Sequence, residues 1–269
     1  MDLLKRDHAP VTPEAWKQID EEAKRVLRLD LAGRKLVDLD GPHGWRHAAV
    51  NTGELSIRPD GGLGVPWGLR VVLPLIEIRV PFELPMMLLD TASRGAVLDL
   101  PAVVSAAEKA AHAEDTAIFH GFKAGGMEGI IPSSPHAAIA IADDYAAYPS
   151  IVGNAVETLR RAGIDGPYAL ALGPDAYWGL AQAAEDGHPI RERVEHFLDG
   201  PMVLAPAIDG AVLLSHRGGD FQLSVGQDLS VGYAGHDRDK VHFYLTESFA
   251  FRVLDRAAAV YLKPRRAKK

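Results

Sequence analysis

The sequence predicts a globular protein of the α+β class. Its 269 residues suffice for one large domain or two modest ones. A content of 47% hydrophobic and 24% charged residues is typical of a folded protein, which excludes wholesale disorder and a fibrous repeat. Long helical patterns come early in the chain, helices alternate with strands in the middle, and strands dominate after residue 217. This partial segregation of helices from strands favours the α+β class.

The first expected helix begins at Thr12-Pro13-Glu14. These residues supply a hydroxyl N-cap, a proline at the first helical position and an acid in the first turn. Apolar residues then recur at helical spacing as far as Gly33, which we interpret as a left-handed terminator. Charged residues occupy the opposite side, so the helix is amphipathic and its apolar face must pack on another element.

Glycines and prolines punctuate short alternating runs between residues 41 and 75. This pattern predicts a hairpin-like excursion with too few apolar residues to form a core of its own. A long segment of this kind is usually functional, or is an arm that packs elsewhere. Residues 75–84 then alternate apolar and charged side chains, which predicts a half-buried strand.

A second long helix is expected from Asp99-Leu100-Pro101 to Phe119, with Gly121 as its stop signal. Its many alanines allow close packing against a sheet or another helix. Beyond residue 135, alternating elements predict a small α/β module within the chain. Its expected helices are 150–162 and 174–185, and its expected strands are 168–172, 202–204 and 212–215. The closing strands are expected at 221–225, 229–233, 241–254 and 260–262.

Charge and composition narrow the classes of function. The 29 basic and 36 acidic residues give a net charge of −7, and a surface that is negative on balance makes nucleic acid an improbable main partner. The absence of cysteine excludes disulfides, cysteine-ligated zinc and a thiol nucleophile. Charged residues at the start of the chain do not fit a secretory signal, and the sequence has no apolar run long enough for a membrane span. A cytoplasmic protein is expected.

The sequence offers little that resembles a catalytic or metal site. It has neither a Walker loop nor a Gly-x-Ser-x-Gly nucleophile elbow, so a hydrolase is a weak alternative. His43 and His47 have the spacing of metal ligands on a helix, but the neighbouring proline and glycine disfavour a helix there. His112, Asp115 and His120 form a second candidate, for which hydrogen-bonded histidines are the better interpretation. We predict no metal and no cofactor.

Glu114 and Asp115 are adjacent carboxylates on the second long helix. Neighbouring residues diverge by about 100° around a helix, so the two do not form a paired general acid and base. A solvated or salt-bridged helix face is the simpler interpretation. No catalytic residue is therefore predicted.

Ordered segments along nearly the whole chain, from about residue 3 to residue 262, carry a family resemblance. They resemble the encapsulins, shell proteins once described as linocin-type bacteriocins. The segments are Leu4–Arg6 (LKR) with Ala9-Pro10, Gly33–Asp38 (GRKLVD), Asp40–Trp45 (DGPHGW), Trp67–Arg70 (WGLR), Leu73–Glu77 (LPLIE), Gly163–Tyr168 (GIDGPY), Arg217–Phe221 (RGGDF), Gly226–Tyr233 (GQDLSVGY) and Thr246–Phe249 (TESF).

The resemblance implies the Hong Kong phage-type major capsid fold, which has a peripheral domain, an axial domain and an extended arm, the E-loop. The implied divisions are 1–49, the N-terminal amphipathic helix and the start of the peripheral domain; 50–74, the arm; 75–135, the peripheral domain with the spine helix; 136–216, the axial domain; 217–255, peripheral-domain strands; and 256–269, an axial-domain strand and a basic tail.

The resemblance also implies a function. Encapsulins self-assemble into closed icosahedral shells, the smallest of which has on the order of sixty subunits. The shell encloses a cargo enzyme, commonly a ferritin-like iron oxidase for iron storage or a dye-decolourising peroxidase, held by a short terminal peptide. A phage major capsid protein, which shares the fold, is the main alternative.

Two sites are expected from the family. The first is a cargo-peptide groove between the first helix and the late strands, in which Arg34 anchors a carboxylate or carbonyl, Asp38 a basic residue, and apolar residues the aliphatic side chains. The expected groove residues are Leu27, Leu31, Arg34, Asp38, Asp228, Val231 and Tyr233. The alternative is that the leucines merely attach the helix to its own subunit.

The second expected site is a pore. Residues 185–189 resemble the loop that converges at the fivefold axis in encapsulins. Repetition of Glu185, Asp186 and His188 around one opening would create a field that attracts cations and weakens as His188 is protonated. An ordinary polar turn is the alternative.

Overall fold

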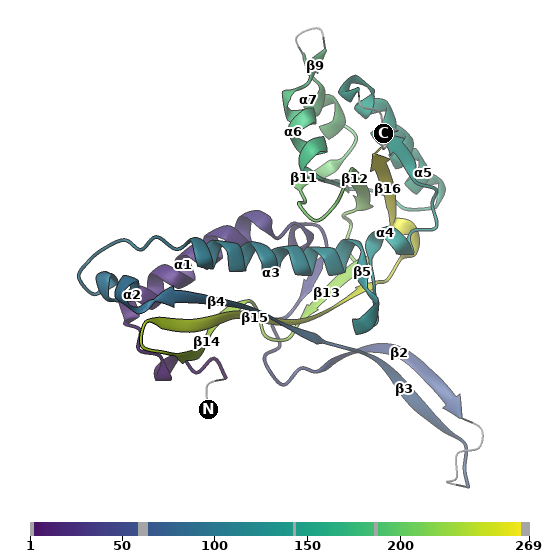
Figure 1. Cartoon of the computed structure of the whole chain (residues 1–269). Coiled ribbons are helices and arrows are strands. Elements are labelled where there is room, and N and C mark those ends of the chain that lie inside the picture. The colour runs from purple at the N-terminus through teal and green to yellow at the C-terminus, as the bar shows by residue number, and fades with distance from the viewer. Residues whose placement is uncertain (1–2, 59–63, 142–143, 186–187, 265–269) are drawn as a thin grey trace, which may run out of the picture.

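The structure is a computed structural model that describes residues 3–58, 64–141, 144–185 and 188–264. Two five-stranded sheets organise the described part (Figure 1). In sheet 1 the strands β1, β13, β15 and β14 follow one another, and β4 pairs with β15; in sheet 2 the order is β11-β8-β12-β16-β7. The strands of sheet 1 are β1 (Asp38–Asp40), β4 (Ile76–Pro85), β13 (Phe221–Val225), β14 (Ser230–His236) and β15 (Lys240–Val253). Those of sheet 2 are β7 (Ile139–Ile141), β8 (Tyr168–Leu172), β11 (Asp199–Leu204), β12 (Ala211–Ser215) and β16 (Ala259–Pro264).

The first helix, α1 (Pro13–Asp30), starts as predicted but ends differently. Thr12 accepts a hydrogen bond from the Ala15 backbone N–H, at 3.4 Å. The helix ends at Asp30, and the prediction that Gly33 is a left-handed terminator is wrong, because Gly33 opens a short 3-10 helix, η2 (Gly33–Lys35). A Cβ on Gly33 would lie 2.4 Å from Cδ1 of Ile118, so glycine is needed there for close approach to another helix.

That other helix is α3 (Pro101–Phe119), and its bounds agree with the prediction. Its alanines Ala106, Ala107, Ala110 and Ala111 are buried. Small side chains let α3 contact α1, β4 and β15 closely, and α1 and α3 cover sheet 1 in Figure 1. This packing forms one of two apolar cores, and the other surrounds sheet 2 and continues onto β13, part of β15 and the end of α3.

The predicted hairpin-like arm is a two-stranded ribbon of β2 (Ala49–Arg58) and β3 (Trp67–Pro74). It projects away from the body of the molecule (Figure 1). The strand that follows, β4, alternates half-buried and exposed residues over most of its length, as predicted.

The second half of the chain adds the predicted helices and strands of sheet 2. One helix is shorter than predicted: it ends at Gln182 instead of Glu185, because residues 184–185 pair with 188–189 as a small hairpin. The remaining elements are α2 (Met86–Ala92), β5 (Gly121–Phe122), β6 (Met127–Glu128), α4 (Ile130–Ser133), α5 (Tyr148–Arg161), α6 (Pro174–Gln182), β9 (Ala184–Glu185), β10 (His188–Pro189) and α7 (Ile190–Glu195). None of the helices in the described ranges is both long and apolar enough to cross a bilayer.

The two sheets are connected by three chain segments. Residues 134–138 lead from α4 to β7, residues 216–220 lead from β12 to β13, and residues 254–258 lead from β15 to β16. The second and third pass directly from a strand of one sheet to a strand of the other, and the first leaves α4, which contacts both α3 and β16.

Candidate functional site

A groove of about 600 Å³ lies between α1 and the segment that enters β14. On the helix side, Leu27 and Leu31 are one turn apart, and on the strand side Leu229 and Val231 face them. The backbone of the N-terminal segment is held beside them, because Leu4 O accepts a hydrogen bond from the Tyr233 N–H at 2.8 Å. The lining residues are Leu4, Arg6, Asp20, Ala23, Lys24, Leu27, Arg28, Leu31, Arg34, Lys35, Asp228, Leu229, Ser230, Val231 and Leu245.

Most of the residues expected in this groove line it, namely Leu27, Leu31, Arg34, Asp228 and Val231. Asp38 does not. It lies on β1, borders a different cavity and accepts a hydrogen bond from the Gly219 N–H at 2.6 Å. Tyr233 is buried under the N-terminal segment, and its hydroxyl contacts His236 Nδ1. The prediction that both residues face the groove is therefore wrong.

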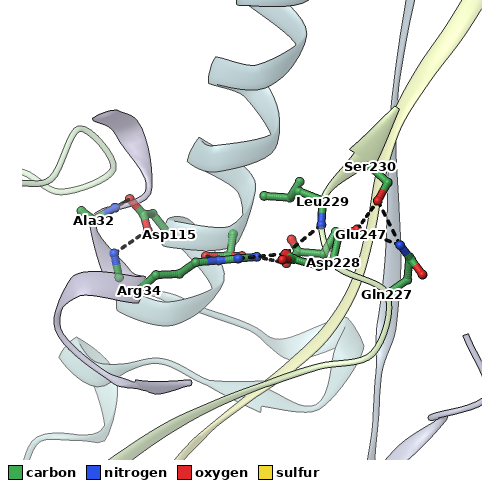
Figure 2. Close-up of polar contacts among 10 residues, drawn as sticks. Ala32, Arg34, Asp115, Gln227, Asp228, Leu229, Ser230 and Glu247 are labelled. Atoms are coloured by element: carbon green, nitrogen blue, oxygen red, sulfur yellow. Dashed lines mark hydrogen bonds and ion pairs between the residues drawn. The ribbon is translucent and has the colours of Figure 1, made fainter. Parts of the chain in front are cut away.

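Arg34 lies at the end of the groove among three carboxylates (Figure 2). Its Nη1 donates to Asp228 Oδ1 at 2.8 Å, its Nε and Nη2 donate to Glu114 at 3.0 and 2.8 Å, and its Nη2 also donates to Glu247. Arg34 was expected to anchor the peptide, and in the structure its guanidinium is engaged by side chains of the same subunit. Arg34 instead joins the end of α1 to α3 and β15.

The carboxylates around Arg34 outnumber its single positive charge. Glu114 and Glu247 are both fully buried, and Oε2 of Glu247 has no hydrogen-bond partner. Burial, followed by the charge of Glu114, raises the pKa of the Glu247 carboxyl well above its ordinary value. Burial opposes the charged form of Arg34, but the hydrogen bond to Glu114 and the charges of Glu114, Glu247 and Asp228 together outweigh it and raise the pKa of the guanidinium. The environment of Glu247 therefore favours the neutral form of its carboxyl more than water does.

Asp115 binds the backbone that follows α1. It is 1% exposed and accepts hydrogen bonds from the N–H groups of Ala32, at 3.0 Å, and Gly33, at 2.8 Å. Figure 2 shows Asp115 beside the start of the segment that carries Arg34. Burial raises the pKa of Asp115 to about 7, although the two backbone N–H groups oppose the shift.

The interpretation of Glu114 and Asp115 as a solvated or salt-bridged surface was wrong about their burial. The sequence contained a signal for the burial of these two acids. Glu114 follows Ala110 and Ala111 by four and three residues, and Asp115 follows Ala111 by four, so helical periodicity places both acids on the packed alanine face. A buried cationic partner should then have been sought.

Asp115 gives the stability of the subunit a specific pH dependence. The folded state binds its proton more tightly than the unfolded chain does, where the ordinary pKa is 3.8. The stabilisation contributed by this group is thus fully present below about pH 4 and is lost as the pH rises through about 7. Relative to Asp115→Asn, the wild-type free energy of unfolding should fall between about pH 4 and about pH 7 and then level off, measured by urea titration. A pH-independent difference would contradict this assignment.

The histidines considered as metal ligands do not converge on one site. Nε2 of His43 contacts Asp40 Oδ1 at 2.9 Å, and its ring centroid lies 4.6 Å from that of His47. His112 is exposed, and Nε2 of His120 contacts the Ala207 carbonyl at 2.9 Å. The described residues contain no group of three or more potential ligands that could hold a metal ion.

Glu185 and His188 lie at the small β9–β10 hairpin, at the tip of the part of the molecule formed by sheet 2 (Figure 1). His188 is exposed and pairs in register with Glu185. Asp186 lies outside the described residues.

Comparison with known proteins gives the family. The family model described as "Encapsulating protein for peroxidase" matches residues 1–250. The type 1 encapsulin shell protein of Rhodospirillum rubrum is 44% identical to the chain, over 98% of this chain and 97% of its own length. The chain belongs to the encapsulin shell protein family. The corresponding shell protein of Mycobacterium tuberculosis is 41% identical, with coverage of 97% and 99%.

Solved structures confirm the predicted fold of this encapsulin. The virus-like particle from Pyrococcus furiosus matches with a TM-score of 0.63 at 15% identity, covering 92% of this chain and 99% of that one. Mycobacterium phage Bobi matches with a TM-score of 0.58 at 14% identity, covering 88% and 91%. The fold is that of Hong Kong-type capsid proteins. Because the relatives at 41–44% identity are shell proteins, the chain is not itself an enzyme, and the hydrolase alternative is removed.

Proposed function

We propose that this encapsulin assembles with copies of itself into a closed cytoplasmic shell of on the order of sixty subunits, without nucleic acid, around a cargo enzyme. Sheet 1 with α1 and α3 corresponds in this proposal to the peripheral domain, and sheet 2 to the axial domain. The β9–β10 hairpin is proposed to line a cation-attracting pore.

The observation that carries the proposal is the arm. Side chains alternate between the two faces of a strand, so Leu55, Ile57 and Val72 share one face of the β2–β3 ribbon, while Leu69 and Val71 lie on the other. All five are exposed, and Ile57 is 70% exposed. A ribbon with apolar residues on both faces is marginally stable in water and gains its burial from neighbouring subunits.

A phage capsid protein would share this arm, so the contents of the shell decide between the two functions. The net charge of −7 supports a shell that does not package nucleic acid. Electron micrographs of purified shells, combined with the ratio of absorbance at about 260 and 280 nm, test the proposal. Closed shells with a protein-like ratio support an encapsulin compartment, and shells filled with nucleic acid would favour the capsid alternative.

We propose further that the groove beside α1 holds the terminal peptide of the cargo enzyme. Its apolar floor, formed by Leu27, Leu31 and Val231, suits aliphatic side chains, and exposed Lys24 and Arg28 stand at its rim. The name of the family model supports a peroxidase as cargo. A ferritin-like iron oxidase, with iron storage as the function, is the second cargo class.

Loading of cargo provides the test of this groove. Leu27 and Val231 also belong to the core, so substituting them risks unfolding the subunit. Leu229 packs against that core but is partly exposed in the groove, and Leu229→Asp should abolish capture of a reporter that carries the terminal peptide of a cargo peroxidase. The matched control is Leu29→Asp, on the same helix as Leu27 but 63% exposed and outside the groove. Equal loading of both variants would reject the groove.

A further inference from the structure

The motif Arg217–Phe221 lies in one of the three segments that connect the two sheets. Its backbone is held in an unusual conformation, because Gly218 and Gly219 both have positive φ, of 84° and 83°. Consecutive glycines in this region give the chain wide conformational freedom. The segment also borders a cavity of about 260 Å³, lined in part by Leu36 and His216. Phe221, at the end of the motif, is buried in the apolar core that the two sheets share, whereas the two glycines contribute no side chain to it.

Side chains of three aspartates and one arginine hold the connecting segment 216–220 in place. Nε and Nη2 of Arg217 donate to the two carboxylate oxygens of Asp220, at 3.1 and 2.9 Å, which closes the glycine turn. Nη2 also reaches Oδ2 of Asp255 at 3.4 Å, in the connecting segment 254–258. From sheet 1, Asp38 Oδ2 accepts the Gly219 N–H at 2.6 Å.

The backbone strengthens the same link between segments. The Asp220 carbonyl accepts hydrogen bonds from the N–H groups of Leu254, at 2.8 Å, and Asp255, at 3.1 Å. The third connecting segment is tied in on the other side, since Nε2 of His136 contacts the Ala257 carbonyl at 2.9 Å. The three connections therefore form one bundle, in which Arg217 bridges two of them.

We propose that Arg217 is a positioning residue that fixes the angle between the two sheets, and thereby the curvature and size of the shell. The inference rests on the proposed assembly into a closed shell. A single exposed ion pair has a small effect in one subunit, but the same bias acts in every copy of a symmetric shell. A change in angle that is small in one subunit therefore adds up over all subunits and alters how the whole shell closes.

Two variants isolate this role. Asp255→Asn keeps the acceptor that caps the Ala257 N–H, at 2.9 Å, but removes the charge that faces Arg217. Arg217→Lys keeps the positive charge but loses the planar fork that reaches Asp220 and Asp255 together. The matched control is Arg256→Ala, in the same segment 254–258, which removes an ion pair to Glu128 between side chains that are 65% and 50% exposed.

The readout is the distribution of shell sizes, measured by native mass spectrometry and by particle classes in cryo-electron micrographs. Wild type and Arg256→Ala should share one narrow size class. In Asp255→Asn and Arg217→Lys, the fraction of particles outside that class should rise about fivefold or more, because losing one exposed ion pair shifts an equilibrium by up to about fivefold and the same bias acts in every copy. If both variants match the control, the role of Arg217 is wrong although the shell proposal stands. If wild type forms no shell, both proposals fail.

Discussion

Removal of residues 51–64, most of the arm, is expected to leave a folded subunit that no longer closes into shells. The deleted part carries Leu55 and Ile57, which contribute nothing to either core of the subunit because they are 57% and 70% exposed. In an assembly, each large apolar side chain that becomes buried contributes about 1.5 to 3 kcal/mol. Losing such contacts in every subunit lowers the free energy of association between subunits below what a stable interface requires.

A point variant makes the same test with less disturbance. Ile57→Asp should abolish assembly with little effect on the thermal midpoint of the isolated subunit, since the side chain is solvated there. Glu54→Gln, at another exposed position of β2, is the matched control and should assemble normally. Light scattering measures assembly, and circular dichroism measures folding. Normal shells from Ile57→Asp would show that the arm is not an intersubunit contact.

The second large effect concerns the buried ion pairs that Arg34 forms with Glu114 and Glu247. Arg34→Met removes the cation that pairs with Glu114 and Glu247, and breaking a buried pair of this kind costs about 3 to 5 kcal/mol. For a chain of this length, the thermal midpoint should fall on the order of 10 °C. The measurement is best made in the Ile57→Asp background, because assembly would otherwise stabilise the folded subunit.

Two comparisons show whether the loss arises from uncompensated charge. Adding Glu247→Gln to Arg34→Met should restore part of the stability, because one buried carboxyl no longer needs a partner. Arg256→Ala removes an exposed ion pair and should cost no more than about 1 kcal/mol. The deficit of Arg34→Met should also shrink as the pH falls, because the raised pKa of Glu247 makes this carboxyl easier to neutralise. Equal losses from Arg34→Met and Arg256→Ala would contradict the account.

Local patterns in the sequence were sufficient to predict most elements of the fold. The Thr12-Pro13 start fixes the beginning of α1, and the alanine spacing between 106 and 111 predicts the close packing of α3. The alternation in β4 predicts a half-buried strand. The assignment to a capsid fold came from the family resemblance, because pairing between distant strands leaves no local signal.

The groove shows where sequence reasoning reaches its limit. Leu27 and Leu31 could be predicted because helical spacing places them on one face, but Asp38 could not be placed correctly. The 3-10 turn after α1 redirects the chain into β1, beside the Gly219 backbone. The partners of Arg34 are between 80 and 213 residues away along the chain, so only the fold brings these charges together.

The most direct test of the proposed function is the mass of the purified wild-type particle. Closed shells of on the order of sixty copies of a 29.0 kDa chain should have a shell mass of about 1.7 MDa, with any enclosed cargo adding to it. Native mass spectrometry after gentle purification measures this directly. A discrete species near that mass, or a larger one consistent with a bigger closed icosahedron, is the predicted result. Monomers or dimers at all protein concentrations would contradict the account.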